Sequence, residues 1–318
     1  MRGKLGFFAG KRYRVGETWT LSESNNDVGA AGGIAYGDGL FVLTAERLFT
    51  STDGVTWITR SRPASQSDVT FTAVTYGNGL WIAGGFKAAE SSTSVIATSA
   101  DGITWTARTH GSVAEISDLA YGGGLYVAVD TIVGSATPMQ TSPDGITWTS
   151  RSLPSSVTYG SVAYGGGLFV AAAPAATSNH IVTSADGITW TGRNVVGGAQ
   201  MFLGSVGYGD GLWVVAGSQA GSSARIWTSS DAITWTARGN GDGFGTSAQG
   251  IAHGDGKFVV VGQGNGGSYI TTSDDGTSWT SRTNPNSSEL RGVAYGQGRF
   301  VASMFDQQGT SIPALVSA

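Results

Sequence analysis

Residues 99–105 read Ser99-Ala100-Asp101-Gly102-Ile103-Thr104-Trp105, and this short stretch decides the fold because it recurs along the chain. Similar stretches begin at Ser51, Ser142, Ser184, Ser229 and Ser273. The closing Trp belongs to a series whose neighbours are 38 to 48 residues apart: Trp19, Trp57, Trp105, Trp148, Trp190, Trp235 and Trp279. Self-similarity at a period of roughly 40–45 residues is the signature of a repeat architecture.

A second motif recurs with the same period. A Tyr or His is followed each time by Gly-x-Gly, at Tyr36, Tyr76, Tyr121, Tyr164, Tyr208, His253 and Tyr295. In the second unit, four short β-rich segments lie between clusters of Gly, Asn, Ser and Asp, at 71–76, 80–84, 94–98 and 103–108. Such segments are typical of strands joined by hairpins, and Asn78-Gly79 suits a hairpin turn that needs positive φ. Each unit therefore predicts four antiparallel strands.

The repeats predict an all-β fold, a single seven-bladed β-propeller, because four antiparallel strands repeated radially define this architecture. The last unit has candidate strands at 291–295, 299–304 and 312–317 but ends before a Trp, whereas Trp19 has no unit before it. We therefore expect the N-terminal strand to close the last blade. Residues 16–318 then form the propeller, and residues 1–15 form an N-terminal arm.

Composition argues against several classes of function. Charged residues make up 13% of the chain, and the net charge is −4 with a pI near 5.3. We therefore expect no nucleic-acid partner and no basic surface for an anionic membrane. No apolar run approaches the roughly 18 residues that span a bilayer, and residues 1–10 do not resemble a secretory signal. With no Cys and three scattered His, we expect no disulfide, no metal site and no cofactor. His253 stands where other units have Tyr, which favours a variant of the repeat over a metal ligand.

The pattern Ser-x-Asp-Gly-x-Thr-Trp resembles a shortened Asp-box, or BNR-type, repeat of sialidases and many other propellers. The fifth copy departs from it at Ala232, and Trp19 follows Glu17-Thr18 without an Asp. A turn Asp accepts backbone N–H bonds and the Trp can pack between blades. We therefore expect a structural role for Asp53, Asp101, Asp144, Asp186, Asp231 and Asp275. The Arg residues that end the fourth strands recur equally, and we expect them to belong to the scaffold: Arg60, Arg108, Arg151, Arg193, Arg238 and Arg282.

Sequence variation falls on one side of the expected ring. In a four-stranded meander, the first and third turns share one face, and these turns carry the two recurrent motifs; we name it the motif face. The second turns and the connections between blades share the opposite, variable face. Binding residues usually lie on such loops of a rigid scaffold, although drift without function would give the same pattern. The candidate binding residues are Tyr159, Phe244, Arg225, Arg291, Glu115 and Glu289, and further apolar residues there are Phe86, Met139, Tyr269 and Phe305.

A sialidase-like glycosidase is the sharpest enzyme hypothesis. That chemistry needs several Arg residues for a carboxylate, a Tyr nucleophile with a Glu partner, and an acid/base Asp. The candidates outside the repeat motifs are Arg62, Arg225, Arg291, Tyr159, Glu115, Glu289, Asp68 and Asp118. The family's Arg motif of the first blade is absent, and no unit carries a long insertion. A two-carboxylate mechanism with Glu115 and Asp118 has no more support, so we expect the protein not to be an enzyme.

The repeats as a whole, such as IAYGDGLFV and TSADGITWTAR, are similar to BNR and WD40-like propellers of bacteriophage virion proteins and of some bacterial surface proteins. This resemblance implies a tail, fibre or other exterior component of a phage particle. Its partners would be other virion proteins, a host-surface glycan or a host protein, and it could be oligomeric. The alternatives are a bacterial surface lectin, located outside the cell or on its surface, and the glycosidase.

Overall fold

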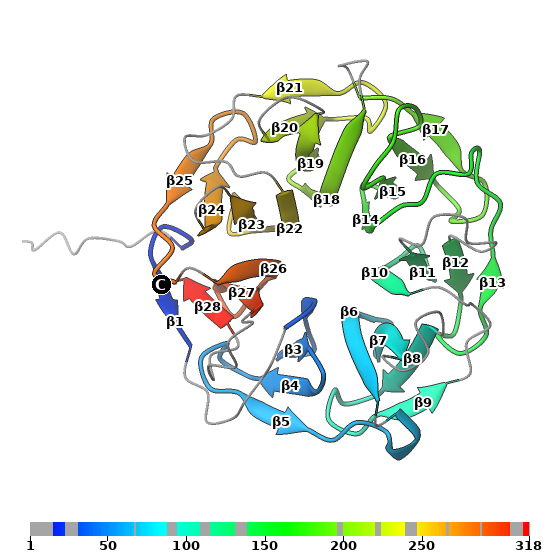
Figure 1. Cartoon of the computed structure of the whole chain (residues 1–318), viewed down its shortest axis with the longest axis vertical. Coiled ribbons are helices and arrows are strands. Elements are labelled where there is room, and N and C mark those ends of the chain that lie inside the picture. Colours follow the sequence, from blue (N-terminus) through cyan, green and yellow to red (C-terminus); the bar gives the residue numbers. More distant parts are fainter. Residues whose placement is uncertain are drawn as a thin grey trace, which may run out of the picture.

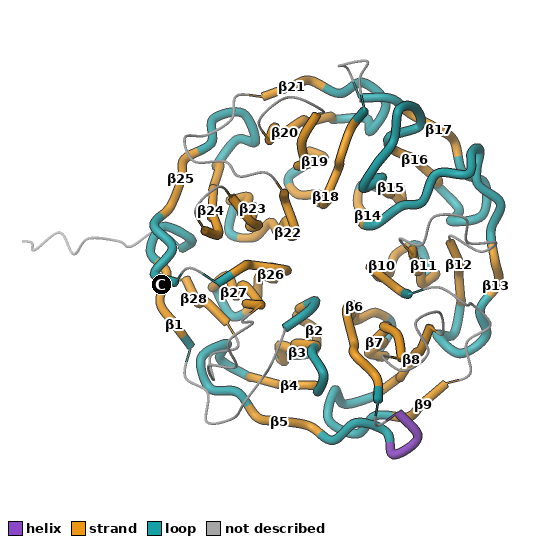
Figure 2. The backbone as a smooth tube through the Cα atoms, viewed as in Figure 1, coloured by secondary structure: helices purple, strands orange, loops and turns teal. Residues whose placement is uncertain are grey.

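The fold is known from a computed structural model, which describes residues 15–22, 31–66, 68–87, 94–108, 115–130, 139–195, 200–219, 224–238, 247–264, 267–286, 288–305 and 314–317. The described residues form seven four-stranded antiparallel sheets arranged around a central axis (Figure 1). The only described helical segment is the short turn η1 (Ala64–Gln66) at the rim (Figure 2). The predicted all-β, seven-bladed propeller is therefore confirmed.

Each blade runs from an inner strand beside the axis to an outer strand at the rim (Figure 1). Blade 1 contains β2 (Ile34–Gly37), β3 (Leu40–Thr44), β4 (Leu48–Ser51) and β5 (Ile58–Arg60). Blade 2 contains β6 (Val69–Gly77), β7 (Leu80–Lys87), β8 (Ser94–Ser99) and β9 (Thr106–Arg108). Blade 3 contains β10 (Ile116–Gly122), β11 (Leu125–Asp130), β12 (Met139–Ser142) and β13 (Thr149–Ser150). Blade 4 contains β14 (Ser161–Gly165), β15 (Leu168–Ala172), β16 (Ile181–Ser184) and β17 (Thr191–Arg193).

The remaining three blades repeat this order. Blade 5 contains β18 (Met201–Gly209), β19 (Leu212–Gln219), β20 (Ala224–Ser229) and β21 (Thr236–Arg238). Blade 6 contains β22 (Ser247–Gly254), β23 (Lys257–Gly264), β24 (Gly267–Ser273) and β25 (Thr280–Arg282). Blade 7 contains β26 (Glu289–Gly296), β27 (Arg299–Phe305), β28 (Ala314–Ser317) and, as its outer strand, β1 (Trp19–Leu21).

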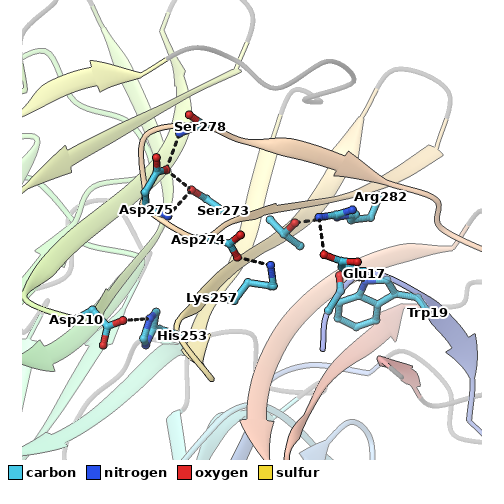
Figure 3. A network of polar contacts seen from close by, with 12 residues as sticks. Glu17, Trp19, Asp210, His253, Lys257, Ser273, Asp274, Asp275, Ser278 and Arg282 are labelled. Atoms are coloured by element: carbon cyan, nitrogen blue, oxygen red, sulfur yellow. Dashed lines mark hydrogen bonds and ion pairs between the residues drawn. The ribbon is translucent and has the colours of Figure 1, made fainter. Parts of the chain in front are cut away.

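Blade 7 joins the two ends of the chain, as the sequence predicts. Strand β1 pairs with β28 so that Trp19 lies opposite Ser317, and the backbone N–H of Ser22 donates to the carbonyl of Ala314 at 2.9 Å. The Glu17 carboxylate also lies 3.8 Å from the Arg282 guanidinium of blade 6 (Figure 3). Strand β27 pairs with the inner edge of β28, and the N-terminal strand β1 supplies the hydrogen bonds along its outer edge. Residues 1–14 of the expected arm lie outside the described residues.

The motif face is built from tight turns. In the hairpin between β6 and β7, Asn78 has φ 48° and Gly79 has φ 74°, the two left-handed residues that a type I′ turn requires. Beside each turn, the aromatic ring of one blade lies against the motif Gly of the preceding blade. At Gly122, for example, an added Cβ would lie only 1.9 Å from Cγ of Tyr164. His253 takes the Tyr position in this series, with its Nε2 3.2 Å from Oδ2 of Asp210 (Figure 3).

Hydrogen bonds within the third turn explain why Asp and Ser recur there. Oδ1 of Asp101 accepts the backbone N–H groups of Ile103 and Thr104, each at 2.8 Å, and the Ser99 hydroxyl donates to it at 2.9 Å. These hydrogen bonds lower the pKa of Asp101 to about 2. Figure 3 shows the same turn at Asp275, where Ser278 and Ser273 donate. These hydrogen bonds are those of a carboxylate that holds its own turn together, so a structural role remains our prediction for these residues.

One boundary predicted from the sequence is wrong. The fourth strand of the second unit was expected at 103–108, but β9 begins at Thr106. The reason is that the Asp101 carboxylate, not strand β8, accepts the N–H groups of Ile103 and Thr104. The turn therefore extends to Trp105, whose indole N–H donates to the Gly102 carbonyl at 3.0 Å.

The hydrophobic core is divided among the seven junctions between blades. Each junction contains one Trp of the repeat series packed with residues of both neighbours. Between blades 7 and 1, for example, Trp57 shares a cluster with Phe41 and Val301. The recurrent Arg residues fasten the outer strands, since Nε of Arg108 donates to the Thr98 hydroxyl at 2.8 Å and five other Arg repeat this bond. The recurrent Trp and the recurrent Arg residues therefore both make contacts within the propeller scaffold.

Replacing Asp101 with Ala is expected to destabilise the protein by on the order of 1 kcal/mol, the scale of one hydrogen bond, without weakening ligand binding. Asp101→Asn retains an amide oxygen at this position, so we expect a smaller loss. Because the folded pKa is lowered from 3.8 to about 2, the stabilisation by the carboxylate is present above pH 4 and is lost as the pH falls towards 2. Thermal unfolding of the three proteins at pH 7 and pH 3 measures this. Loss of binding at unchanged stability would contradict the structural role.

Candidate functional site

A cavity of about 840 Å³ occupies the centre of the ring, and its wall is formed mainly by the inner strands of all seven blades. Phe86, Pro174 and Phe305 also line it. These residues stand at or just beyond the ends of second strands, where the chain enters the loops of the variable face. The cavity, which we name the central channel, therefore reaches the variable face.

The inner strands place equivalent residues at equal depth in the channel. Three residues before the motif Tyr or His, the wall carries Gly33, Ala73, Asp118, Ser161, Ser205, Gly250 and Gly292. Space is short at this level, since a Cβ added to Gly250 would lie 2.9 Å from Cα of Gly292. Six of these seven positions hold a small residue, and Asp118 is the exception. Blade 3 therefore differs from the other six blades in carrying a charged side chain at this level of the channel.

Asp118 connects two blades inside the channel. Its Oδ1 accepts the N–H of Leu119 at 2.8 Å, and its Oδ2 accepts the N–H of Val162 from blade 4 at 2.9 Å. Burial raises the pKa of Asp118 to about 6, although these hydrogen bonds and one with Ser161 oppose the shift. The carboxylate is therefore held in place by the scaffold and titrates close to neutral pH.

The other charged groups of the channel lie on blades 3 and 7, on opposite sides of the axis in Figure 1. Nε of Arg291 lies 3.2 Å from Oε1 of Glu289, and its guanidinium carbon lies 4.5 Å from the centre of the Phe305 ring. Burial raises the pKa of Glu115, and the positive charge of Arg291 offsets part of that shift. Glu115 and Arg291 of the predicted site are thus brought to one cavity, with Glu289 beside it.

Tyr159 is not a surface residue, so its prediction as a binding residue is wrong. Its side chain is fully buried between blades 3 and 4, and its hydroxyl donates to the carbonyl of Asn179 at 2.9 Å. Burial raises its pKa to about 12. Met139 and Tyr269 are also buried. Met139 begins β12, Tyr269 lies near the start of β24, and Tyr159 lies two residues before β14. At such positions the sequence did not distinguish a loop side chain from a core side chain.

The remaining predicted residues do not join the channel. Arg225 lies on β20 opposite Gly217 and does not line the cavity, and Phe244 lies outside the described residues. Arg62 donates to the carbonyl of Val69 from Nη1 at 3.0 Å and lines a separate small cavity. Asp68 is exposed beside β6. The arginines, tyrosine and acids of the glycosidase hypothesis are therefore not assembled by the described residues.

The two described histidines lie away from the channel. His180 is 2% exposed, its Nδ1 accepts the N–H of Val195 at 3.3 Å, and burial lowers its pKa. His253 packs against Phe258 with ring centres 4.5 Å apart. Within the described ranges, no group of three His, Asp or Glu could hold a metal ion, and no helix could cross a bilayer.

Sequence reasoning missed several residues of the channel wall, notably Phe202, Gln249 and Thr70. Phe202 is the second residue of β18, the inner strand of blade 5, and is 38% exposed. Aligning each unit on its motif Tyr would have found these residues, because the inner-strand wall is made of positions from six residues before that Tyr or His up to the Tyr itself. The sequence signal for a channel residue is therefore its position relative to the motif Tyr, and not the length of the loop in which it lies.

No family model matches the chain, and no curated protein matches it. Among solved structures, the chain is similar to YCF48 bound to D1 peptide, with 13% identity, a TM-score of 0.66, and coverage of 95% of this chain and 94% of that one. It is similar to a streptogramin B lyase structure, with 10% identity, a TM-score of 0.72, and coverage of 95% and 98%. It is also similar to a catalytically inactive His-to-Ala variant of virginiamycin B lyase from Staphylococcus aureus with quinupristin, with 10% identity, a TM-score of 0.74, and coverage of 95% and 99%. Since these neighbours include enzymes and a protein that binds a peptide, the likeness identifies the chain as a seven-bladed β-propeller and leaves its activity open.

Proposed function

We propose that this protein is a non-enzymatic binding protein that takes its ligand into the central channel from the variable face. The observation that carries the proposal is the cavity of about 840 Å³, whose wall departs from the repeat at Glu115, Asp118 and Arg291. Pockets for small ligands and for side chains of a partner are commonly of roughly 300–1,000 Å³, with a few placed polar groups among apolar ones. The ligand is a host-surface glycan or a protein partner.

We also propose that the protein acts on the exterior of a bacteriophage particle, as a tail, fibre or similar component among other virion proteins. The support for this part is the resemblance of the Asp-box repeats alone. Mass spectrometry of purified particles of the phage that carries the gene tests it. If the protein is absent from the particles, its location is cellular, as for a bacterial surface lectin, and the proposed binding in the channel is unaffected.

A glycosidase is the weaker alternative. The Tyr159 hydroxyl is bonded inside the core, and Arg62, Arg225 and Arg291 lie in three different blades or their connections. A hydrolysis assay with sialosides and other glycosides would detect the alternative directly. Turnover that is lost in a Glu115→Gln variant would overturn the non-enzymatic part of the proposal.

The binding function is tested at the mouth of the channel. Phe202→Ala removes a partly exposed aromatic ring from the wall, and we expect it to weaken binding to host cells or to a glycan array about tenfold, while the melting temperature changes little. The matched control is Ile188→Ala, which removes an apolar side chain that is 50% exposed in an Asp-box turn of the motif face. Equal effects of the two substitutions, or no binding by the wild-type protein, would contradict the proposal.

A further inference from the structure

Glu115 is a carboxylate in the channel wall that lacks a hydrogen-bonding or ion-pairing partner among the described residues. Its side chain is half-buried there. A carboxylate that loses water without gaining a partner destabilises the folded protein. Such a group in a cavity is suited to a ligand that supplies the missing positive charge and donors.

Arg291 does not neutralise Glu115 by contact. Its guanidinium is engaged by both carboxylate oxygens of Glu289, at 3.2 and 3.3 Å, and lies over the Phe305 ring. The channel and its immediate surroundings thus contain three carboxylates, those of Glu115, Asp118 and Glu289, but one guanidinium, that of Arg291. When all three are ionised, the site carries two negative charges in excess, which attract a cation and repel an anion.

The rest of the wall indicates what kind of cation fits. Thr70, Ser247 and Gln249 present hydroxyl and amide groups, which suit the hydroxyl groups of a sugar. Phe86 and Phe202 supply aromatic surface near the mouth, on which the apolar face of a sugar ring or a cation can lie. Carboxylates, hydroxyl groups and aromatic rings together match a hydroxylated, positively charged ligand.

We propose that the central channel binds a glycan with a free amino group, an amino sugar whose ammonium group lies beside Glu115 and Asp118 of blade 3. This inference rests on the proposed binding function and specifies its ligand class. Glu115 provides the unpaired charge, and Asp118 provides a second carboxylate fixed by the backbone N–H groups of Leu119 and Val162. Arg291 lines the opposite wall, where Glu289 beside it offsets its charge, so the net negative charge of the site disfavours anionic sugars.

Calorimetric titration of the full-length protein with the β-1,4-linked disaccharide of glucosamine tests the proposal, with the di-N-acetylated disaccharide as the neutral control. We expect binding of the amine and at least tenfold weaker binding of the acetylated sugar. Glu115→Gln should weaken binding of the amine about tenfold, the scale of a charge-assisted hydrogen bond. The matched control, Glu46→Gln, neutralises an exposed acid between β3 and β4 on the variable face and should bind like wild type.

The dependence on pH provides a readout that a misfolded variant would not reproduce. Between pH 6 and pH 4 the amino group of the sugar stays largely protonated, whereas Asp118, whose pKa is raised to about 6, gains a proton, and the raised pKa of Glu115 acts in the same direction. Affinity should therefore fall as the pH is lowered. The fall should be smaller in the Glu115→Gln variant, because one titrating carboxylate is gone, and its melting temperature should not decrease.

Each other outcome is decisive. Equal affinity for both disaccharides, or no effect of Glu115→Gln, overturns the proposal. Binding of a lysine-containing peptide but not of the amino sugar overturns the assignment to a glycan. If neither disaccharide binds while host-cell binding still depends on Phe202, the ligand class is wrong and the proposed binding function stands. If host-cell binding is also absent, the proposed function fails as well.

Discussion

A chain that begins at residue 23, without β1, is expected to melt about 10 °C or more below the intact protein. The deletion removes Trp19, which is 6% exposed in the junction between blades 6 and 7, and loss of a buried Trp side chain costs roughly 3–5 kcal/mol. For a chain of this size, each kcal/mol lowers the melting temperature by about 2–4 °C. The deletion also leaves β28 as an open edge, and exposed edges promote association between chains. Thermal unfolding and size-exclusion chromatography measure both effects.

The matched control is a chain that begins at Val15. It removes only residues 1–14 and keeps Val15, which packs against the cluster of Trp19 and Phe300. We expect it to unfold like the intact protein, because it keeps every residue of the ring that the structure describes. If both truncated chains lost the same stability, the β1–β28 pairing would not be what closes the propeller.

The repeat made most of the fold predictable. The fixed period and the two turn motifs gave the number of blades and the strand order, because every blade packs against its neighbours in the same way. The Trp without a preceding unit gave the closure of the ring by the N-terminal strand. The boundary at Trp105 was not predictable in the same way. Strand propensity extends back to Ile103, and only the hydrogen bonds to Asp101 keep that residue in the turn.

The candidate site was predictable only in part. Glu115 and Arg291 were selected because they interrupt the repeat on the variable side, and both line the channel. Tyr159 met the same criterion and is buried, because the loop before β14 folds inward and its hydroxyl finds a carbonyl partner. Whether a residue in an irregular connection points to the channel or to the core depends on the path of that connection, which the periodicity does not encode.

Gly122→Ala is expected to be the most disruptive single substitution in a recurrent motif. The added methyl group would lie 1.9 Å from Cγ and 2.0 Å from Cδ1 of Tyr164, a ring held between blades 3 and 4. Overpacking of a filled core typically costs about 1–3 kcal/mol, and occasionally more. We expect a loss at or above the upper end of that range, because the obstacle is a rigid ring and not a flexible chain end. Urea or thermal unfolding measures it.

Two further variants separate this steric cause from a general intolerance of the turn. Gly124→Ala tests the backbone alone, since nothing lies within 4 Å of its added Cβ and its φ is +79°, so a left-handed penalty of about 1–2 kcal/mol is expected. Tyr164→Ala removes the obstructing ring. In the Tyr164→Ala background, Gly122→Ala should cost far less than in the wild type, and the coupling between the two positions should account for most of the loss. Additive losses would mean that the ring is not the reason why this position must be Gly.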